Sequence, residues 1–186
     1  MSVNIIETIQ KNLEYPALQK IDPNIQETKD KYVPTQVEKL AQAAIPAVLA
    51  GLYRLARNEV GANKIIQNDT KADWLKEFYS DKEEEAVQKV AQYAATGEAE
   101  AKSHMENIAT EAVRILKKDT GDTPTPVKVK KFMDDQRHNI LVYLPATMAI
   151  GDLLNDDALD DRTNKMEGPI SNLMHKIEDK LSGGGS

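Results

Sequence analysis

The sequence contains no cysteine, and this absence removes several classes of protein from consideration. Disulfide-stabilised folds, thiolate zinc sites, iron–sulfur clusters and thiol nucleophiles all need the missing residue. A chain of 186 residues can bury enough apolar surface to fold without a metal or a disulfide. The composition therefore favours a single domain in a reducing compartment, and we expect a cytoplasmic location.

Long apolar runs and a secretion signal are also missing. The longest apolar run covers residues 43–53, whereas a membrane-spanning helix needs about 20 residues. The N-terminal residues MSVNIIETIQ carry no basic segment ahead of an apolar stretch, so we expect no signal peptide. The net charge of −6 disfavours contact with nucleic-acid phosphates, and Lys128, Lys130 and Lys131 are interpreted as the solvated start of a helix. We therefore expect neither a membrane nor a nucleic acid as a partner.

Motifs that carry catalysis are lacking as well. The chain has no glycine-rich phosphate loop, no Gly-x-Ser-x-Gly elbow and no His-Glu-x-x-His sequence. The pattern around Ser80, Ser103 and Ser171 places no base near any of the three hydroxyls. We therefore assign no catalytic residue and no cofactor, and the sequence favours a non-enzymatic protein.

The chain is rich in apolar residues at helical spacing. From Thr35 onwards, apolar residues recur at steps of three and four, which defines one buried stripe of a helix. Asn4, with Glu7 three positions on, resembles a capping box at the start of another helix. Trp74 belongs to a short helix between Lys71 and Tyr79. Because no convincing strand pattern occurs, we predict an all-α bundle of about seven to nine helices.

Breaks in the apolar pattern predict the helix boundaries. Residues 118–126, KDTGDTPTP, predict a loop, and Pro126 suits the first turn of the next helix. We expect that helix to be broken near Asp134 and otherwise to continue through residues 141–154. Gly61 is expected either to break the helix or to mark a tight joint. Other boundaries are expected at a helix cap (Asp81), a helix interruption (Thr96 and Gly97) and the start of a last helix (Gly168).

Two prolines lie within similar apolar stretches. Pro46 lies in AAIPAVLAGL and Pro145 in VYLPATMAIG. A proline inside a helix removes one backbone hydrogen bond, so we expect both residues to bend core helices. The similarity predicts an internal repeat of residues 28–82 and 127–180 within one domain, residues 1–181; coincidence between helical sequences is the alternative. The final Gly-Ser segment, residues 182–186, is typical of an expression linker or a tag remnant.

Histidines with nearby acids are the candidate metal ligands. Glu100, His104, Asn107 and Glu111 are spaced four, three and four residues apart, so they share one helix face. Asp135 and His138 resemble half of the acid-x-x-His ligand set of di-iron bundles. The competing interpretation, which we favour, is that both sets form solvated helix faces. His175 is expected at the edge of an apolar stripe, and the acidic run of residues 152–161 does not fit a calcium loop, because Asp161 occupies the glycine position.

The segment AAIPAVLAGL followed by GANKII resembles the YidB-like family, a group of uncharacterised bacterial helical proteins. The later sequence LPATMAIGDLL, together with DDRTNKMEGPISNLMHKI, also resembles uncharacterised bacterial proteins. The resemblance implies an all-helical fold and a bacterial source. It implies no activity and carries over no functional residue.

Two functional hypotheses follow from these patterns. The first is a non-enzymatic helical protein that acts by self-association, as a homo-oligomer, or through a groove that receives a partner helix. The second is a bundle that binds a metal or a small ligand through histidine and carboxylate groups. A contiguous apolar surface favours the first hypothesis, and histidines that converge on carboxylates favour the second.

Overall fold

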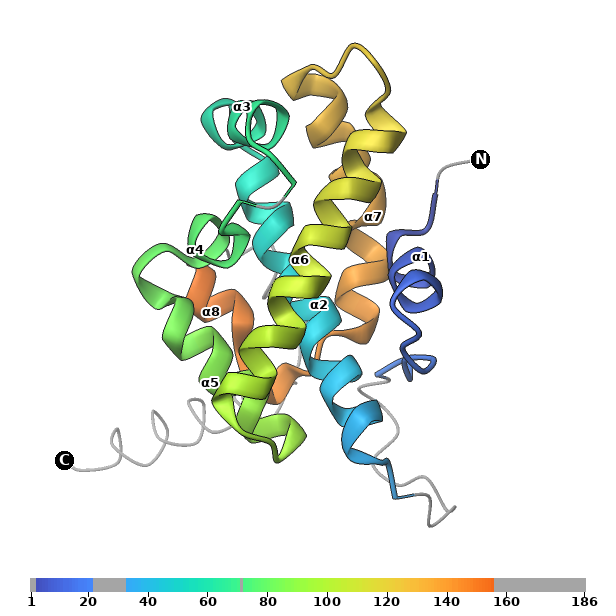
Figure 1. Ribbon diagram of the computed structural model, residues 1–186, viewed down its shortest axis with the longest axis vertical. Helices are drawn as coiled ribbons and strands as arrows, with labels where there is room; N and C mark the ends of the chain where they lie inside the picture. The colour runs from blue at the N-terminus through green and yellow to red at the C-terminus, as the bar shows by residue number, and fades with distance from the viewer. Residues whose placement is uncertain (1–2, 22–32, 71, 156–186) are drawn as a thin grey trace, which may run out of the picture.

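The computed structural model describes residues 3–21, 33–70 and 72–155. Within these ranges every regular element is helical, which confirms the predicted all-α fold. The elements are α1 (Ile5–Asn12), α2 (Gln36–Ala56), α3 (Glu59–Gln67), α4 (Trp74–Tyr79), η1 (Ser80–Lys82), α5 (Glu83–Ala94), α6 (Glu98–Thr120), α7 (Pro126–Tyr143), η2 (Ala146–Met148) and α8 (Ile150–Leu154). Figure 1 shows the longer helices gathered around α2.

Helix α2 is the centre of the core. Every residue from Leu40 to Tyr53 is buried, and α2 packs against α4, α5, α6 and α7. A helix that is apolar on all sides is stable in water only when other helices cover it. The segment AAIPAVLAGL is therefore the axis of the bundle (Figure 1), and no described helix meets the length and hydropathy that a bilayer crossing requires.

The two prolines occupy different positions. Pro46 lies inside α2, as expected. Pro145 does not lie in a helix, so the expected bend there is wrong: α7 ends at Tyr143, and Pro145 precedes the turn η2. The residue before a proline avoids the α region, and Leu144 is extended, with φ −74° and ψ 118°. The predicted repeat stays a prediction, since much of its second copy lies outside the described residues.

The predicted helix starts agree well with the structure. The Asn4 side chain accepts hydrogen bonds from the backbone N–H groups of Ile6 and Glu7, at 3.1 and 3.4 Å. Thr35 and Glu38 form a capping box at the start of α2. Pro126 is in the first turn of α7, as expected from the loop before it. Local side-chain chemistry therefore accounts for where these helices begin.

Two expected boundaries are wrong. Asp81 does not cap a helix; it lies in η1, because Ser80 adopts a positive φ of 56° that ends α4 and starts a short turn before α5. Helix α7 also continues without a break past Asp134. Lys131 forms an ion pair of 3.0 Å with Asp135 one turn later, an arrangement that supports a continuous helix. The predicted helix from Gly168 lies outside the described residues.

Two buried glutamines attach residues 3–21 to the bundle. Gln136 of α7 accepts from the N–H of Ile5 at 3.1 Å and donates to the carbonyl of Val3 at 2.8 Å. Gln42 of α2 binds both backbone groups of Gln19, at 2.8 and 3.1 Å. Each amide side chain therefore satisfies backbone groups that have no partner within a helix, because Val3 and Gln19 lie outside helices and Ile5 is the first residue of α1.

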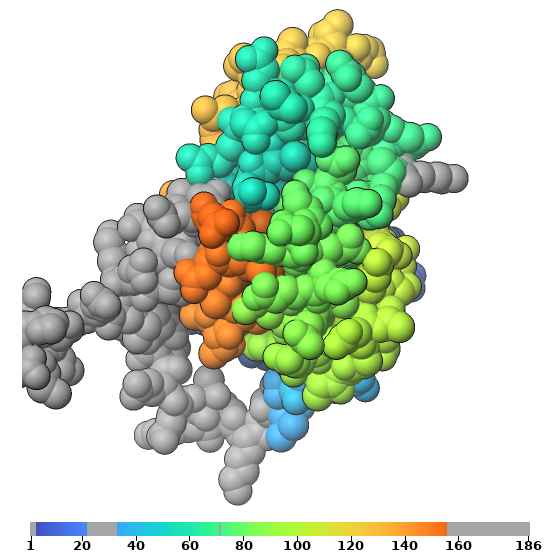
Figure 2. Space-filling view, turned by 90° about the vertical axis from the view of Figure 1, so that its left-hand side faces the viewer, coloured from blue at the N-terminus to red at the C-terminus, as the bar shows by residue number. Residues whose placement is uncertain are grey.

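Helix α8 closes the described part of the chain beside α5. Figure 2 shows α8, in orange, next to the green segments α4 and α5. The Nζ of Lys82 donates to the carbonyl of Leu153 at 3.0 Å, so a lysine from the turn η1 binds the C-terminal end of α8. Cations stabilise that end of a helix because its carbonyls lack partners.

Candidate functional site

His104, one of the candidate metal ligands, has a different partner in the structure. The Tyr15 hydroxyl forms a hydrogen bond with Nδ1 of His104, and burial raises the pKa of Tyr15 to about 12. The hydroxyl is therefore protonated at neutral pH and can donate to a neutral imidazole. The carboxylate of Glu100 accepts instead from the Thr96 hydroxyl. Residues 100 and 104 share a helix, as the spacing predicts, but they take part in separate contacts.

The second candidate pair is not assembled into a site either. Asp135 forms its ion pair with Lys131, and His138 is exposed on α7. Among residues 3–21, 33–70 and 72–155, no three histidine or acidic side chains come close enough to hold a metal ion. His175 and Asp161 lie outside these ranges.

Glu111 shares the face of His104 and links α1 to α6. Its carboxylate accepts from Asn12 at 2.7 Å and from Arg114 at 2.6 and 2.7 Å. The bond from Arg114, opposed by burial and assisted by Asn12, lowers the pKa of Glu111. The residue is thus ionised and fully engaged at neutral pH, which indicates a structural role for it.

A groove lies where the first turns of α3 and α7 meet. It has a volume of about 350 Å³ and is lined by Ala56, Arg57, Asn58, Glu59, Ala62, Pro126, Val127 and Lys130. Ala56 and Ala62 are buried and form the apolar floor, whereas Arg57 and Lys130 are exposed on the rim. Figure 2 shows α3, in teal, at the same end of the molecule as the gold segment that begins α7.

Two valines at the groove are mostly exposed: Val127 lines it, and Val60 follows the lining residue Glu59 in the sequence. Val127 is 76% exposed and Val60 is 70% exposed. Each is the second residue of its helix, so its side chain lies in a first turn that projects away from the core. Single exposed valines are common on proteins, but two of them beside an apolar groove make a surface that a partner could cover. We call the groove with Val60 and Val127 the α3–α7 groove.

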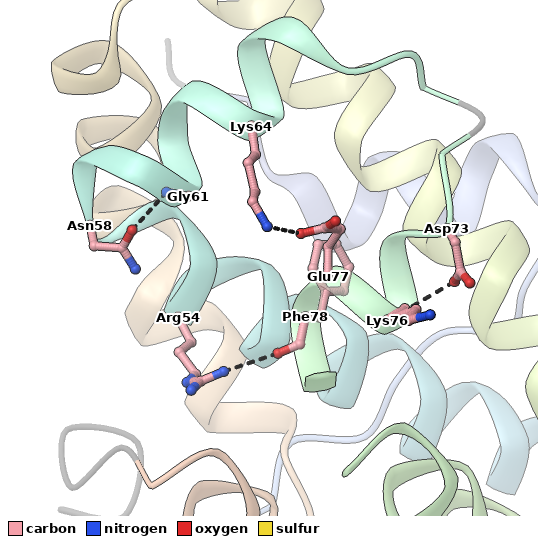
Figure 3. A network of polar contacts seen from close by, with 8 residues as sticks. All are labelled: Arg54, Asn58, Gly61, Lys64, Asp73, Lys76, Glu77 and Phe78. Carbon is pink, nitrogen blue, oxygen red and sulfur yellow. Dashed lines mark hydrogen bonds and ion pairs between the residues drawn. The ribbon is translucent and has the colours of Figure 1, made fainter. Parts of the chain in front are cut away.

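A network of polar contacts fixes α3 at this position (Figure 3). The Asn58 side chain accepts from the N–H of Gly61 at 2.6 Å, which caps α3 directly after α2 ends. Lys64 of α3 forms an ion pair of 2.6 Å with Glu77 of α4. Arg54 of α2 donates to the carbonyl of Phe78 at 3.2 Å. The wall that α3 contributes to the groove is therefore tied to both α2 and α4.

Gly61 allows α3 to approach the end of α2. A Cβ atom at this position would lie 2.0 Å from the carbonyl oxygen of Leu55. Of the two alternatives predicted for Gly61, a helix break and a tight joint, the structure shows the second: Gly61 lies inside α3, at a contact with α2 that requires a glycine. The groove therefore depends on a residue that does not line it.

Charge is unevenly distributed along the bundle. Residues 114–131, which form the end of α6 and the start of α7, contain six basic and two acidic residues, a net charge of +4 in a chain of net charge −6. Residues 81–106 contain seven acidic and three basic residues, a net charge of −4. Helix α6 connects the two regions, which lie at opposite ends of the bundle (Figure 1). The α3–α7 groove is at the basic end.

Sequence reasoning did not find this groove. Val60 and Val127 fall outside the buried stripes, and the helices that carry them, α3 and α7, pack against each other. The sequence does carry one indication of the groove: Val60 and Val127 each stand at the second position of a helix, where a solvated helix carries polar residues. Lys128, Lys130 and Lys131 were interpreted as a solvated helix start, which agrees with their exposure.

Comparisons of this chain with protein families, curated proteins and solved structures found no match.

Proposed function

We propose that the protein is a non-enzymatic binding module whose α3–α7 groove receives an apolar side chain of a partner helix. The observation that carries this proposal is the pairing of a groove of about 350 Å³ with two valines that are 70% and 76% exposed. An apolar floor next to uncovered apolar side chains gains free energy when a partner excludes water from it. A fully buried leucine or valine anchor contributes about 1.5–3 kcal/mol.

A helix is the form of partner that suits this surface. The groove is bounded by helices α3 and α7. The described residues form no strand, so they offer no sheet edge to which an extended peptide could add. An amphipathic helix presents apolar side chains at steps of three and four, which can contact Val60, Val127 and the floor together. The alternative of metal binding has no cluster of ligands to support it in the described ranges.

Selection from a displayed library of helical peptides on the full-length protein tests the proposal. Selected peptides are measured by fluorescence polarisation against wild type, Val127→Asp and Val60→Asp. We expect each substitution to weaken binding by about tenfold or more, since it places a charge where an apolar contact forms. Both aspartates occupy a first turn, where the helix dipole favours a negative charge, so the variants should fold.

Val37→Asp is the matched control. Val37 is also the second residue of its helix and is 56% exposed, but it lies at the opposite end of α2, about 28 Å from Ala56 along the helix axis. We expect it to bind selected peptides as wild type does. The proposal is contradicted if the selected peptides bind all four proteins equally. It is also contradicted if analytical ultracentrifugation shows a wild-type dimer that Val127→Asp dissociates.

A further inference from the structure

The basic surroundings of the α3–α7 groove identify the charge of its partner. We propose that the groove selects an acidic amphipathic helix, in which carboxylates flank the apolar anchor. This inference rests on the binding function proposed above and adds the chemistry of the partner to it.

Positive charge is concentrated at the end of the bundle that holds the groove. The groove lies at the end of the bundle where residues 114–131 carry a net charge of +4, although the chain as a whole carries −6. An excess of one sign near a concave surface raises the local concentration of partners of the opposite sign and speeds their association. A neutral or basic helix of the same shape would lack this advantage.

Some basic residues near the groove hold the fold together, and others face the groove. Lys117 donates to the carbonyls of Ile66 and Asn68 and so binds the C-terminal end of α3. Lys128 donates to the Thr123 carbonyl at 2.9 Å. Lys130 is exposed, lines the groove and has no partner among the described residues. Its ammonium group is therefore available to a carboxylate of a bound helix.

A second copy of this chain in a symmetric arrangement is disfavoured by the charge around the groove. The groove lining holds Arg57 and Lys130 against one acid, Glu59, so a two-fold dimer through the α3–α7 groove would set two surfaces with excess positive charge against each other, since both subunits of such a dimer use the same patch. Like charges that face each other across an interface oppose association by several kcal/mol in unfavourable cases. The charge of the groove therefore favours a different, acidic chain as the occupant.

The experiment uses peptides from the selection described above, each in three versions with Glu, Gln or Lys at the positions that flank its anchor. We expect affinity to fall in the order Glu, Gln, Lys, and the difference to shrink when salt is raised from about 0.05 M to about 0.5 M. Lys130→Glu should weaken the Glu version by about fivefold to thirtyfold and should strengthen the Lys version. This exchange of preference is a result that a loss of folding cannot produce.

Lys76→Glu is the control for net charge. Lys76 is exposed on α4, its ammonium group has no partner among the described residues, and it does not line the groove. We expect a much smaller effect from this variant, although it changes the net charge of the protein equally. An equal effect of the two variants would overturn the role of Lys130.

The remaining outcomes separate failure of the inference from failure of the proposed function. If selected peptides depend on Val127 but bind equally well in all three charge versions, the groove binds helices and the inference is wrong. If no selected peptide depends on Val127, both are wrong. Co-sedimentation with vesicles of phosphatidylcholine and phosphatidylserine tests whether the groove binds a lipid surface instead. The inference is overturned if the protein binds these vesicles, Lys130→Glu abolishes the binding and no acidic peptide displaces the protein.

Discussion

Replacement of Gly61 by alanine tests whether the joint between α2 and α3 is as tight as the structure indicates. The added Cβ atom would lie 2.0 Å from the carbonyl oxygen of Leu55 and 2.9 Å from its Cδ1. The side-chain contact can be relieved by rotation, but the oxygen belongs to the backbone of the buried helix α2. Helix α3 would have to move by about 1.4 Å to reach the 3.4 Å of an ordinary contact. We therefore expect Gly61→Ala to destabilise the protein.

The expected magnitude combines two opposing effects. Alanine is a better helix former than glycine by about 1 kcal/mol, which favours the variant. Overpacking a closely packed contact costs about 1–3 kcal/mol and sometimes more. Because the obstacle is backbone, we take the upper end of that range, which leaves a net loss of about 2 kcal/mol in the free energy of unfolding. For a chain of this length, that loss corresponds to a fall in Tm of about 4–8 °C.

Urea unfolding followed by tryptophan fluorescence measures this change directly. Trp74 is the only tryptophan and is 2% exposed, so its emission reports on the packing of α4 beside the joint. Gly51→Ala is the comparison, because its Cβ would lie 2.8 Å from the Cβ of Phe78, a less severe contact. We expect a smaller loss for it. A Gly61→Ala protein as stable as wild type would refute the argument that backbone contact fixes α3.

Three further predictions concern other parts of the fold. Gln136→Leu removes the partner of the buried Ile5 N–H and of the half-buried Val3 carbonyl, so we expect a loss of about 2 kcal/mol in urea unfolding and faster hydrogen exchange in α1. Wild-type exchange there would contradict this. Gly97→Ser adds an N-cap to α6 at φ −74° and ψ 148°, with no atom within 4 Å of the new Cβ, and should raise stability by about 0.5 kcal/mol; a loss would be inconsistent with an open cap. Glu111 has a lowered pKa, chiefly because Arg114 donates to it, so its stabilisation is complete above the ordinary value of 4.5 and is lost as pH falls through the lower folded value. Glu111→Gln should therefore reduce the dependence of unfolding free energy on pH in that acidic range, and an unchanged slope would show that the carboxylate contributes nothing.

Local rules were sufficient to predict several helices of the described ranges and some of their ends, but α3 as a separate helix and the end of α7 at Tyr143 were not predicted. The apolar stripe after Thr35 and the cap at Asn4 are properties of a few neighbouring residues, and they appear in the structure as the sequence indicates. Such features are predictable because helix capping and periodicity depend on contacts within a few residues. The fold class follows from them.

The errors occur where distant segments decide the outcome. Pro46 and Pro145 have similar neighbours in sequence, yet only Pro46 remains inside a helix, because α2 is covered on several sides by α4, α5, α6 and α7. His104 was expected to face Glu100 and solvent, whereas Tyr15 from the N-terminal segment contacts the imidazole. In both cases the determining contact lies far away along the chain, where periodicity carries no information.

The α3–α7 groove shows the same limit and also indicates where function resides in this fold. Polar side chains elsewhere often support the structure: Gln42 and Gln136 bind backbone groups, and Lys117 binds the end of α3. In contrast, Val60 and Lys130 contribute little to the folded state, since the first is 70% exposed and the second has no partner in the described part of the chain. Side chains that the fold does not need for its stability can bind a partner, and substituting them leaves the folded protein as stable as before. Substitutions at the groove should therefore change binding while leaving the unfolding free energy nearly unchanged, and substitutions at Gly61 should change both.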